Sequence, residues 1–295
     1  MNTYLDVDLH MHSIKSDDGE FTAEQLITLC KNAGLKTVAI ADHNSVEAVA
    51  DAKIIASEYH INVISAIEID CVIDDVELHV VGYGINEADP SFANLTSSLV
   101  AQEQKLAETR LKKAHDLGLY LDDEKAYSLS HHGCITGEII AEVALQDKRN
   151  HEFLKAYLPG GSRSDNPYVN FYWDYCSQGK PAYVKMEYMS LKEAVDMIKN
   201  AGGIAVLAHP GNNTKENIAL LDKIFTYDME GMEVYSSYHT PAQIAFYHEY
   251  AKTHELSITA GSDFHGKTKP SIHLGEMQCD EPNEIYSSKI LHMGI

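Results

Sequence analysis

Two histidines near the start of the chain, His10 and His12, lie in the string DLHMHS with one residue between them. Residues 4–9 alternate apolar and polar side chains, which predicts a β-strand. Because side chains two positions apart on a strand project from the same face, the two imidazoles would lie side by side, with Asp8 behind them. Two histidines on one rigid face form half of a metal site, and Asp17 and Asp18 in the following loop can supply oxygen ligands. One such pair among 16 histidines is weak evidence by itself, so the rest of the chain decides.

Further histidines and carboxylates accompany short apolar runs that predict strands. These runs cover residues 37–41, 62–67, 77–83, 204–208, 231–235 and 257–260, and helical periodicity separates most of them. Strands that alternate with helices are typical of a parallel sheet or barrel. In a barrel, the carboxyl ends of the strands meet on the face where active sites are built. The candidate residues in or just after these runs are His43, Glu68, His79, His209, Asp263 and His265.

Nitrogen and carboxylate ligands of this kind suit zinc, manganese or iron. Eight or nine candidate ligands exceed the needs of one ion, so we expect two or three ions, with Glu68 placed to bridge a pair. The five cysteines are scattered and include no Cys-x-x-Cys pair. This pattern argues against a thiolate zinc site and a disulfide framework, and it indicates a reducing compartment.

Length and charge narrow the class of protein. A chain of 295 residues is long enough for one large α/β domain, or for one domain with an insertion. The net charge is −21, with 23 Lys and Arg against 44 Asp and Glu, and such a field disfavours stable binding of long nucleic acids. The start of the chain is acidic where a signal peptide would be basic, and no apolar run reaches the length of a membrane span. We therefore expect a cytoplasmic protein without membrane contacts; the oligomeric state stays open.

Residues 86–179 interrupt the alternation of strands and helices. A long polar helix is predicted for 91–117 and an amphipathic helix for 135–146, followed by a tract rich in Gly, Pro and Ser and then by several aromatic residues. We interpret this segment as an inserted, mainly helical cap. The predicted domains are then a barrel formed by residues 1–85 and 180–295, and a cap formed by residues 86–179.

Seven strings occur in the same order as in the polymerase and histidinol phosphatase (PHP) phosphoesterases, a family that this chain resembles over its whole length except the cap: DLHMHS, SDDG, ADHNS, AIEI, HVVGYG, LAHPG and GSDFHG. The resemblance implies an α/β fold, a distorted (β/α)7 barrel, with two or three divalent ions of manganese, zinc or iron. It also implies three ligand sets, the first two of which share Glu68: His10, His12, Glu68 and Asp263; Glu68, His79 and His209; and His43, His265 and a loop aspartate. Many members have Ser-Asp-Gly in that loop. Asp18, which precedes the glycine here, is therefore favoured, with Asp17 as the alternative.

The expected chemistry follows from the ions. Clustered divalent cations lower the pKa of a bridging water, so that hydroxide is available at neutral pH, and they neutralise the charge on a phosphoryl group. His209 and His43 are candidates to protonate the leaving oxygen, provided that they are not wholly committed to metal. Together with Asp263 they are the predicted catalytic residues.

Residues that bind the substrate are expected in the cap and beside it. In relatives that act on nucleoside 3′,5′-bisphosphates, the segment matching residues 135–137 tends to carry an arginine beside the threonine, whereas this chain has Thr136 followed by Gly137. The bisphosphate substrate is therefore in doubt. Lys180 is the preferred phosphate ligand by resemblance, although each such charge is by default a solvated surface residue. The full set of substrate-binding candidates is Lys180, Lys185, Arg149, Arg163 and Thr136.

The sequence thus predicts a metal-dependent phosphohydrolase that acts on a small phosphorylated metabolite, with a nucleotide or phosphoribosyl compound preferred. The enzymatic alternatives are a phosphodiesterase of phosphoribosyl 1,2-cyclic phosphate, a nucleoside 3′,5′-bisphosphate phosphatase and a 5′–3′ exonuclease of short oligonucleotides. The alternative outside enzymology is a catalytically silent module that binds metal or nucleotide and regulates a partner. The complete ligand set argues against that module.

Overall fold

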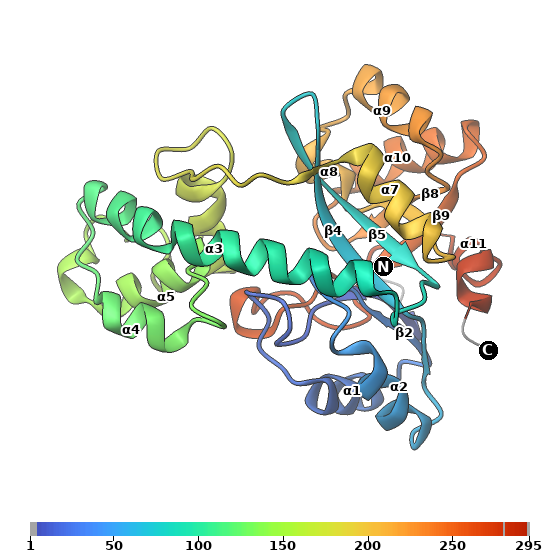
Figure 1. The fold of residues 1–295 in the computed structure, drawn as a ribbon, viewed down its shortest axis with the longest axis horizontal. Helices are drawn as coiled ribbons and strands as arrows, with labels where there is room; N and C mark the ends of the chain where they lie inside the picture. Colours follow the sequence, from blue (N-terminus) through green and yellow to red (C-terminus); the bar gives the residue numbers. More distant parts are fainter. Residues whose placement is uncertain (1–4, 280, 294–295) are drawn as a thin grey trace.

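The computed structural model describes residues 5–279 and 281–293 (Figure 1). The strands of this part of the chain form two sheets. The first is parallel, in the order β1-β2-β3, and comprises β1 (Val7–Met11), β2 (Thr37–Ile40) and β3 (Asn62–Val63). The second has the order β6-β4-β5-β7-β8-β9 and comprises β4 (Ala66–Ile73), β5 (Val76–Tyr83), β6 (Met189–Ser190), β7 (Ile204–Leu207), β8 (Gly231–Ser236) and β9 (Ser257–Gly261).

Backbone hydrogen bonds join the two sheets at two places. Where β1 and β9 end, the amide of His12 donates to the carbonyl of Phe264 at 2.9 Å, and the amide of Asp263 donates to the carbonyl of His10 at 2.8 Å. Beyond the end of β2, the amide of Glu68 in β4 donates to the carbonyl of Asp42 at 3.1 Å. The predicted α/β class is confirmed, with mainly parallel pairing. Full closure into a seven-stranded barrel stays a prediction.

One strand of the second sheet runs against its neighbours. β5 pairs antiparallel with both β4 and β7, and Val80 lies opposite Leu207, the last residue of β7. This direction brings His79, in the first half of β5, beside His209, which follows β7. The prediction that Glu68 ends a strand was wrong, because pairing with β5 starts a new strand at Ala66 and places Glu68 inside it.

The helices that accompany the sheets lie in the N-terminal and C-terminal parts of the chain. Short side chains cap several of them. For example, Thr22 and Ser190 each form a reciprocal capping box at the start of α1 and α7. In chain order these elements are α1 (Ala23–Asn32), α2 (Val49–Ser57), α7 (Leu191–Asn200), α8 (Pro210–Asn213), α9 (Ile218–Ile224), η3 (Phe225–Tyr227), α10 (Pro241–Thr253), η4 (Gly266–Thr268), α11 (Pro282–Tyr286) and η5 (Lys289–His292).

The middle of the chain is helical and lies at one end of the molecule (Figure 1). It comprises α3 (Pro90–Asp116), α4 (Asp123–Leu129), α5 (Gly137–Gln146), η1 (Lys148–Asn150), α6 (Pro167–Phe171) and the π-helical turn η2 (Tyr172–Cys176). The long helix α3 connects two hydrophobic clusters, since Phe92 packs in the cluster that includes the second sheet, while Leu111 packs with α5 and Phe171. The boundaries of a cap at residues 86 and 179 stay a prediction.

In the part of the chain that the structure describes, no helix combines the length and apolarity needed to cross a bilayer.

The end of β9 leaves no room for a side chain at Gly261. A methyl group there would overlap Cβ of His10 and the carboxylate of Glu233. We expect Gly261→Ala to displace His10 and to lower the free energy of unfolding by about 1–3 kcal/mol, a usual cost of overpacking. Thermal unfolding with a metal count on the purified variant checks this; an unchanged midpoint with full metal content would contradict it.

Candidate metal centre

Four buried side chains converge in the first cluster: His10 in β1, His12 just after it, Glu68 in β4 and Asp263 just after β9. His12 Nε2 lies 3.0 Å from Asp263 Oδ1 and 3.3 Å from Glu68 Oε2. His10 Nε2 lies 3.2 Å from the same oxygen of Glu68 and 3.6 Å from Asp263 Oδ1. One ligand atom from each residue lies within 4.8 Å of the other three, a spacing that suits a metal ion between them. The first predicted set is therefore brought together.

The second cluster uses the other oxygen of Glu68. His209 Nε2 lies 2.9 Å and His79 Nδ1 lies 3.0 Å from Glu68 Oε1. Glu68 thus presents Oε2 to the first cluster and Oε1 to the second, which is the arrangement of a carboxylate that bridges two ions. The second predicted set is also brought together.

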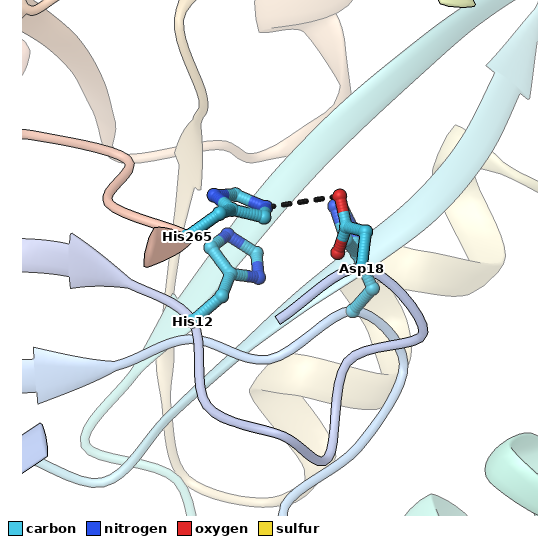
Figure 2. A group of neighbouring side chains, drawn as sticks. His12, Asp18 and His265 are labelled. Carbon is cyan, nitrogen blue, oxygen red and sulfur yellow. Dashed lines mark ion pairs between the residues drawn. The ribbon is translucent and has the colours of Figure 1, made fainter. Parts of the chain in front are cut away.

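The third cluster contains His12, Asp18, His43 and His265, whose ligand atoms also lie within 4.8 Å of one another. Figure 2 shows Asp18 facing His265, with Asp18 Oδ2 at 3.2 Å from His265 Nε2 and His12 beside them. Asp17 lies outside this cluster and lines the neighbouring cavity instead. The geometry therefore favours Asp18 over Asp17, and its role as a ligand stays a prediction.

The electrostatics of the clusters suit divalent cations. Burial alone would raise the pKa of Glu68, but the imidazoles of His10, His43 and His79 hold this pKa well below its usual range. Burial lowers the pKa of His12 to about 4, helped by the neighbouring His265 and His43. The ionised Glu68 carboxylate and the neutral His12 imidazole can therefore both offer lone pairs to a cation.

Several buried ligand atoms also lack a hydrogen-bond partner within the described residues, among them Glu68 Oε2, Asp18 Oδ1 and Asp263 Oδ1. Imidazole nitrogens approach two of these oxygens, Glu68 Oε2 and Asp263 Oδ1, and a cation between the nitrogens and the oxygens would satisfy both. By donor chemistry and by these unpaired atoms, the residues fit the metal ions that the sequence predicts.

A second layer of polar groups fixes the imidazoles. His10 Nδ1 lies 3.1 Å from Glu233 Oε1, and His12 Nδ1 lies 2.8 Å from Ser16 Oγ. The Nδ1 atom of His265 lies 2.9 Å from the carbonyl oxygen of Asp263. In each case the second nitrogen is left free for the cluster. Such partners select the tautomer and orientation of a metal ligand.

Asp70 is a residue that the sequence analysis missed. Its Oδ1 lies 3.3 Å from His43 Nδ1 and 3.4 Å from His79 Nε2, and the three residues form a further group of ligand atoms. Asn44 fixes the other oxygen, because Asn44 Nδ2 donates to Asp70 Oδ2 at 2.8 Å. The signal was present in the sequence, since Asp70 follows Glu68 by two positions on a strand and so shares its face.

Lys269 and Tyr238 were also missed. The Lys269 side chain is buried, with Nζ at 2.7 Å from Asp263 Oδ2 and 3.5 Å from His265 Nε2, and it also lies over the ring of Tyr238. Burial and the carboxylate of Asp263 raise the pKa of the Tyr238 hydroxyl well above its usual range. No sequence pattern pointed to these two residues, because they come from irregular loops.

The clusters open into a cavity of about 520 Å³. Thr136 and Lys180 line it, although the Thr136 hydroxyl also accepts a hydrogen bond from the amide of Ile139 at the start of α5. At Gly137 a Cβ atom would lie 2.9 Å from Cys176 and 3.0 Å from Tyr172. A side chain at this position would therefore meet Cys176 and Tyr172.

The other three predicted substrate residues lie elsewhere. Arg163 lines a second cavity and binds Asp174, with both N–H···O distances at 3.0 Å. Arg149 is exposed, forms an ion pair with Asp147 and lies over the ring of Tyr120. It lines neither cavity. Lys185 is exposed and lines neither cavity. We do not retain Arg149 and Lys185 as phosphate ligands.

Comparison with known proteins identifies similar chains. The family model described as PHP domain matches residues 8–201. The 5′-3′ exoribonuclease Rnm of Salmonella typhimurium is 30% identical over 276 residues, which cover 91% of this chain and 87% of that protein. A 3′,5′-nucleoside bisphosphate phosphatase of Chromobacterium violaceum is 28% identical and covers 92% and 91%. A phosphoribosyl 1,2-cyclic phosphate 1,2-diphosphodiesterase of Eggerthella lenta is 27% identical and covers 91% and 97%.

A solved structure is also similar. It is described as an amidohydrolase from Chromobacterium violaceum with bound sulfate and no metal, and it is 26% identical to this chain with a TM-score of 0.75. The match covers 93% of this chain and 92% of that chain, so the likeness extends over the helical segment as well as the sheets.

Removal of one charge from the shared carboxylate tests the centre. We expect Glu68→Gln to lower the number of bound metal ions and to abolish activity while leaving the secondary structure largely intact, because an amide cannot bridge two cations as a carboxylate does. Metal counting by mass spectrometry and circular dichroism are the measurements. Glu138→Gln, at another buried carboxylate of the same cavity, is the control. Full metal content in Glu68→Gln would refute the bridging role.

The orienting role of Asp70 is tested in the same way. We expect Asp70→Asn to weaken metal binding by about 10- to 100-fold, the usual effect of losing such a partner of a ligating histidine. Competition with a chromophoric chelator measures this affinity. Glu77→Gln removes another carboxylate of the cavity that contacts Tyr183 and belongs to none of the metal groups. Equal affinity losses in both variants would mean that general charge, and not the contact to His43 and His79, is responsible.

Proposed function

This chain belongs to the PHP domain family, and we propose that it is a metal-dependent hydrolase that cleaves a phosphoric ester bond of a small nucleotide-like metabolite. One observation carries the proposal. Four groups of metal-ligand side chains, two of which share Glu68, lie side by side along a cavity large enough for a nucleotide. The proposed location is the cytoplasm, in keeping with five scattered cysteines that include no Cys-x-x-Cys pair.

The residues of the three clusters would hold two or three divalent ions of manganese, zinc or iron, with Asp18 as the loop ligand. When bound, such ions supply an activated water for attack on phosphorus and neutralise the phosphoryl charge. In the overall reaction one P–O bond breaks, the oxygen of water bonds to phosphorus, and the leaving oxygen takes up a proton.

The side chains of this protein add binding and proton transfer. Lys269, held by Asp263 at the cavity wall, would contact a phosphoryl oxygen with its ammonium group, and Tyr238 beside it would donate a hydrogen bond. His43 and His209 also line the cavity and remain the proposed proton donors to the leaving oxygen. Lys180, at the exposed rim, is the proposed second contact to phosphate.

The cavity wall favours a nucleotide with one phosphoryl group. Its aromatic side chains include Tyr172, Trp173 and Tyr188, which can pack against a base. Its arginine, Arg110, is already bound to Glu103, and Gly137 cannot be replaced by an arginine without a clash. We therefore propose a substrate with a single phosphoester at the metal centre in preference to a 3′,5′-bisphosphate.

Turnover of a chromogenic ester tests the function. We expect the protein with manganese to release p-nitrophenol from p-nitrophenyl phosphate, to lose this activity after chelation and to recover it when the metal is restored. The Glu68→Gln variant is the control for contaminating phosphatase. Absence of release with manganese, zinc and iron would refute the proposal and favour the silent binding module.

A further inference from the structure

Contacts to two elements hold the guanidinium of Arg110 at the wall of the first cavity. Arg110 and Glu103 lie two turns apart on α3 and so share one face of the helix. Both terminal nitrogens of Arg110 bind the Glu103 carboxylate: Nη1 donates to Oε2, and Nη2 donates to Oε1 at 2.9 Å. Nη1 also donates to the carbonyl oxygen of Ile135, just before α5, at 3.0 Å. The side chains of Arg110 and Glu103 are only 14% and 13% exposed, so the guanidinium is fixed in place.

These contacts leave one edge of the guanidinium without a partner. The planar group has five N–H bonds, and the three contacts use the two on Nη1 and one of the two on Nη2. Within the described residues, no acceptor binds Nε or the second N–H of Nη2. These two parallel N–H bonds form the Nε edge of the guanidinium. An edge of this kind holds a ligand through two hydrogen bonds at once.

The other two arginines of the chain use the same edge for a carboxylate. Arg163 donates from Nε and Nη2 to Asp174, each at 3.0 Å. Arg149 donates from Nε and Nη2 to Asp147. In Arg110 the carboxylate instead binds the two terminal nitrogens. Arg110 therefore keeps its Nε edge for a ligand in the cavity that it lines.

The charges around this edge favour an uncharged ligand group. Glu103 already neutralises Arg110, and the carboxylates of Asp17 and Glu138 line the same cavity. A second phosphate would approach these carboxylates with no net positive charge nearby to offset the repulsion. An uncharged group with two adjacent acceptors avoids this repulsion. The O6 and N7 atoms of guanine form such a pair, and arginine binds them through two parallel N–H bonds.

Aromatic side chains can hold a base near this edge. Tyr188 and Tyr172 line the same cavity as Arg110. Burial raises the pKa of the Tyr188 hydroxyl well above its usual range; Asp70 adds to this effect and Arg110 opposes it. Tyr188 is therefore near Arg110 and also near Asp70, which belongs to one of the metal-ligand groups. A base packed against these rings can reach Arg110 while its phosphate lies at the metal centre.

We propose that the Nε edge of Arg110 recognises the O6 and N7 atoms of a 6-oxopurine, so that the substrate is a guanine or hypoxanthine nucleotide with one phosphoester at the metal centre. This inference rests on the proposed function and names the base of its substrate. Adenine has an amino group at position 6, which would set a donor against the N–H bonds of Arg110. A site built for two hydrogen bonds discriminates against a ligand that leaves one of them unmade.

Turnover of matched nucleotides tests the base. With manganese bound, we expect kcat/KM for guanosine 5′-monophosphate and inosine 5′-monophosphate to exceed kcat/KM for adenosine 5′-monophosphate about tenfold. The 7-deaza analogue of guanosine 5′-monophosphate lacks the N7 acceptor and should lose about tenfold against the parent nucleotide. This comparison uses the wild-type protein and so does not depend on the folding of a variant. Equal values for the guanine and adenine nucleotides overturn the proposal.

A substitution that keeps the charge tests Arg110 itself. Arg110→Lys removes the planar edge, and we expect the guanine-to-adenine ratio of kcat/KM to fall to about one, whatever the overall loss of rate. Arg163→Lys, at an arginine that lines only the second cavity, is the matched control and should keep the ratio. A second phosphate is the competing ligand. If adenosine 3′,5′-bisphosphate gains over adenosine 5′-monophosphate and loses that gain in Arg110→Lys, Arg110 binds phosphate and the base assignment is overturned.

Binding of nucleosides separates this proposal from the proposed function. Inosine and adenosine carry no phosphate, so their binding to the manganese-loaded protein does not depend on hydrolysis. We expect calorimetry to give a Kd for inosine about tenfold lower than the Kd for adenosine. Equal Kd values overturn the base site, even if p-nitrophenyl phosphate is hydrolysed. A preference for inosine in a protein that hydrolyses no ester supports the base site and refutes the hydrolase.

Discussion

The burial of the Glu68 carboxylate is the constraint on which the rest of the structure depends. Its side chain has no exposure, and an isolated carboxylate in that position would be neutral or would unfold the site. It stays ionised because imidazoles from β1, from β5 and from the loops after β2 and β7 surround its two oxygens. The antiparallel direction of β5 is part of this arrangement, since only that direction brings His79 next to the end of β7. The fold therefore holds elements from most of the chain around one side chain.

Other buried carboxylates connect the loops to this centre. Asp8 accepts hydrogen bonds from the amides of Ser262 and Gly275, each at 2.9 Å, and Asp42 accepts from the amide and hydroxyl of Ser13. Burial raises the pKa of both Asp8 and Asp42 to about 6, because the charged carboxylates lose contact with water. The hydrogen bonds that they accept offset part of this cost. The loops also adopt strained conformations, with φ of 22° at His209 and 57° at Asp263. Packing and carboxylate contacts hold the ligands in backbone conformations that an isolated loop would leave.

The sequence could predict that the metal-ligand candidates lie together because their signal is local: each accompanies a short apolar strand, and parallel strands bring such positions to one face. It did not predict the strand that contains Glu68, since the break after Val63 comes from the hairpin pairing of β4 with β5, which the apolar run 62–67 does not record. Asp70 could have been found from strand parity alone. Lys269 could not, because its contact to Asp263 depends on how an irregular loop folds back, and no periodic pattern records that path. The phosphate-binding role of the basic side chains was hardest to predict from the sequence, because a nearby carboxylate can neutralise such a side chain, as Asp147 neutralises Arg149.

The strong negative charge and the phosphate chemistry are compatible because they act over different distances. Repulsion from a net charge of −21 accumulates over every phosphate of a long nucleic acid, whereas one phosphoryl group at the centre would meet the proposed metal ions and the Lys269 side chain within a few ångströms. Salt screens the distant repulsion and leaves the buried contacts almost unchanged. The balance therefore selects a substrate with few phosphates.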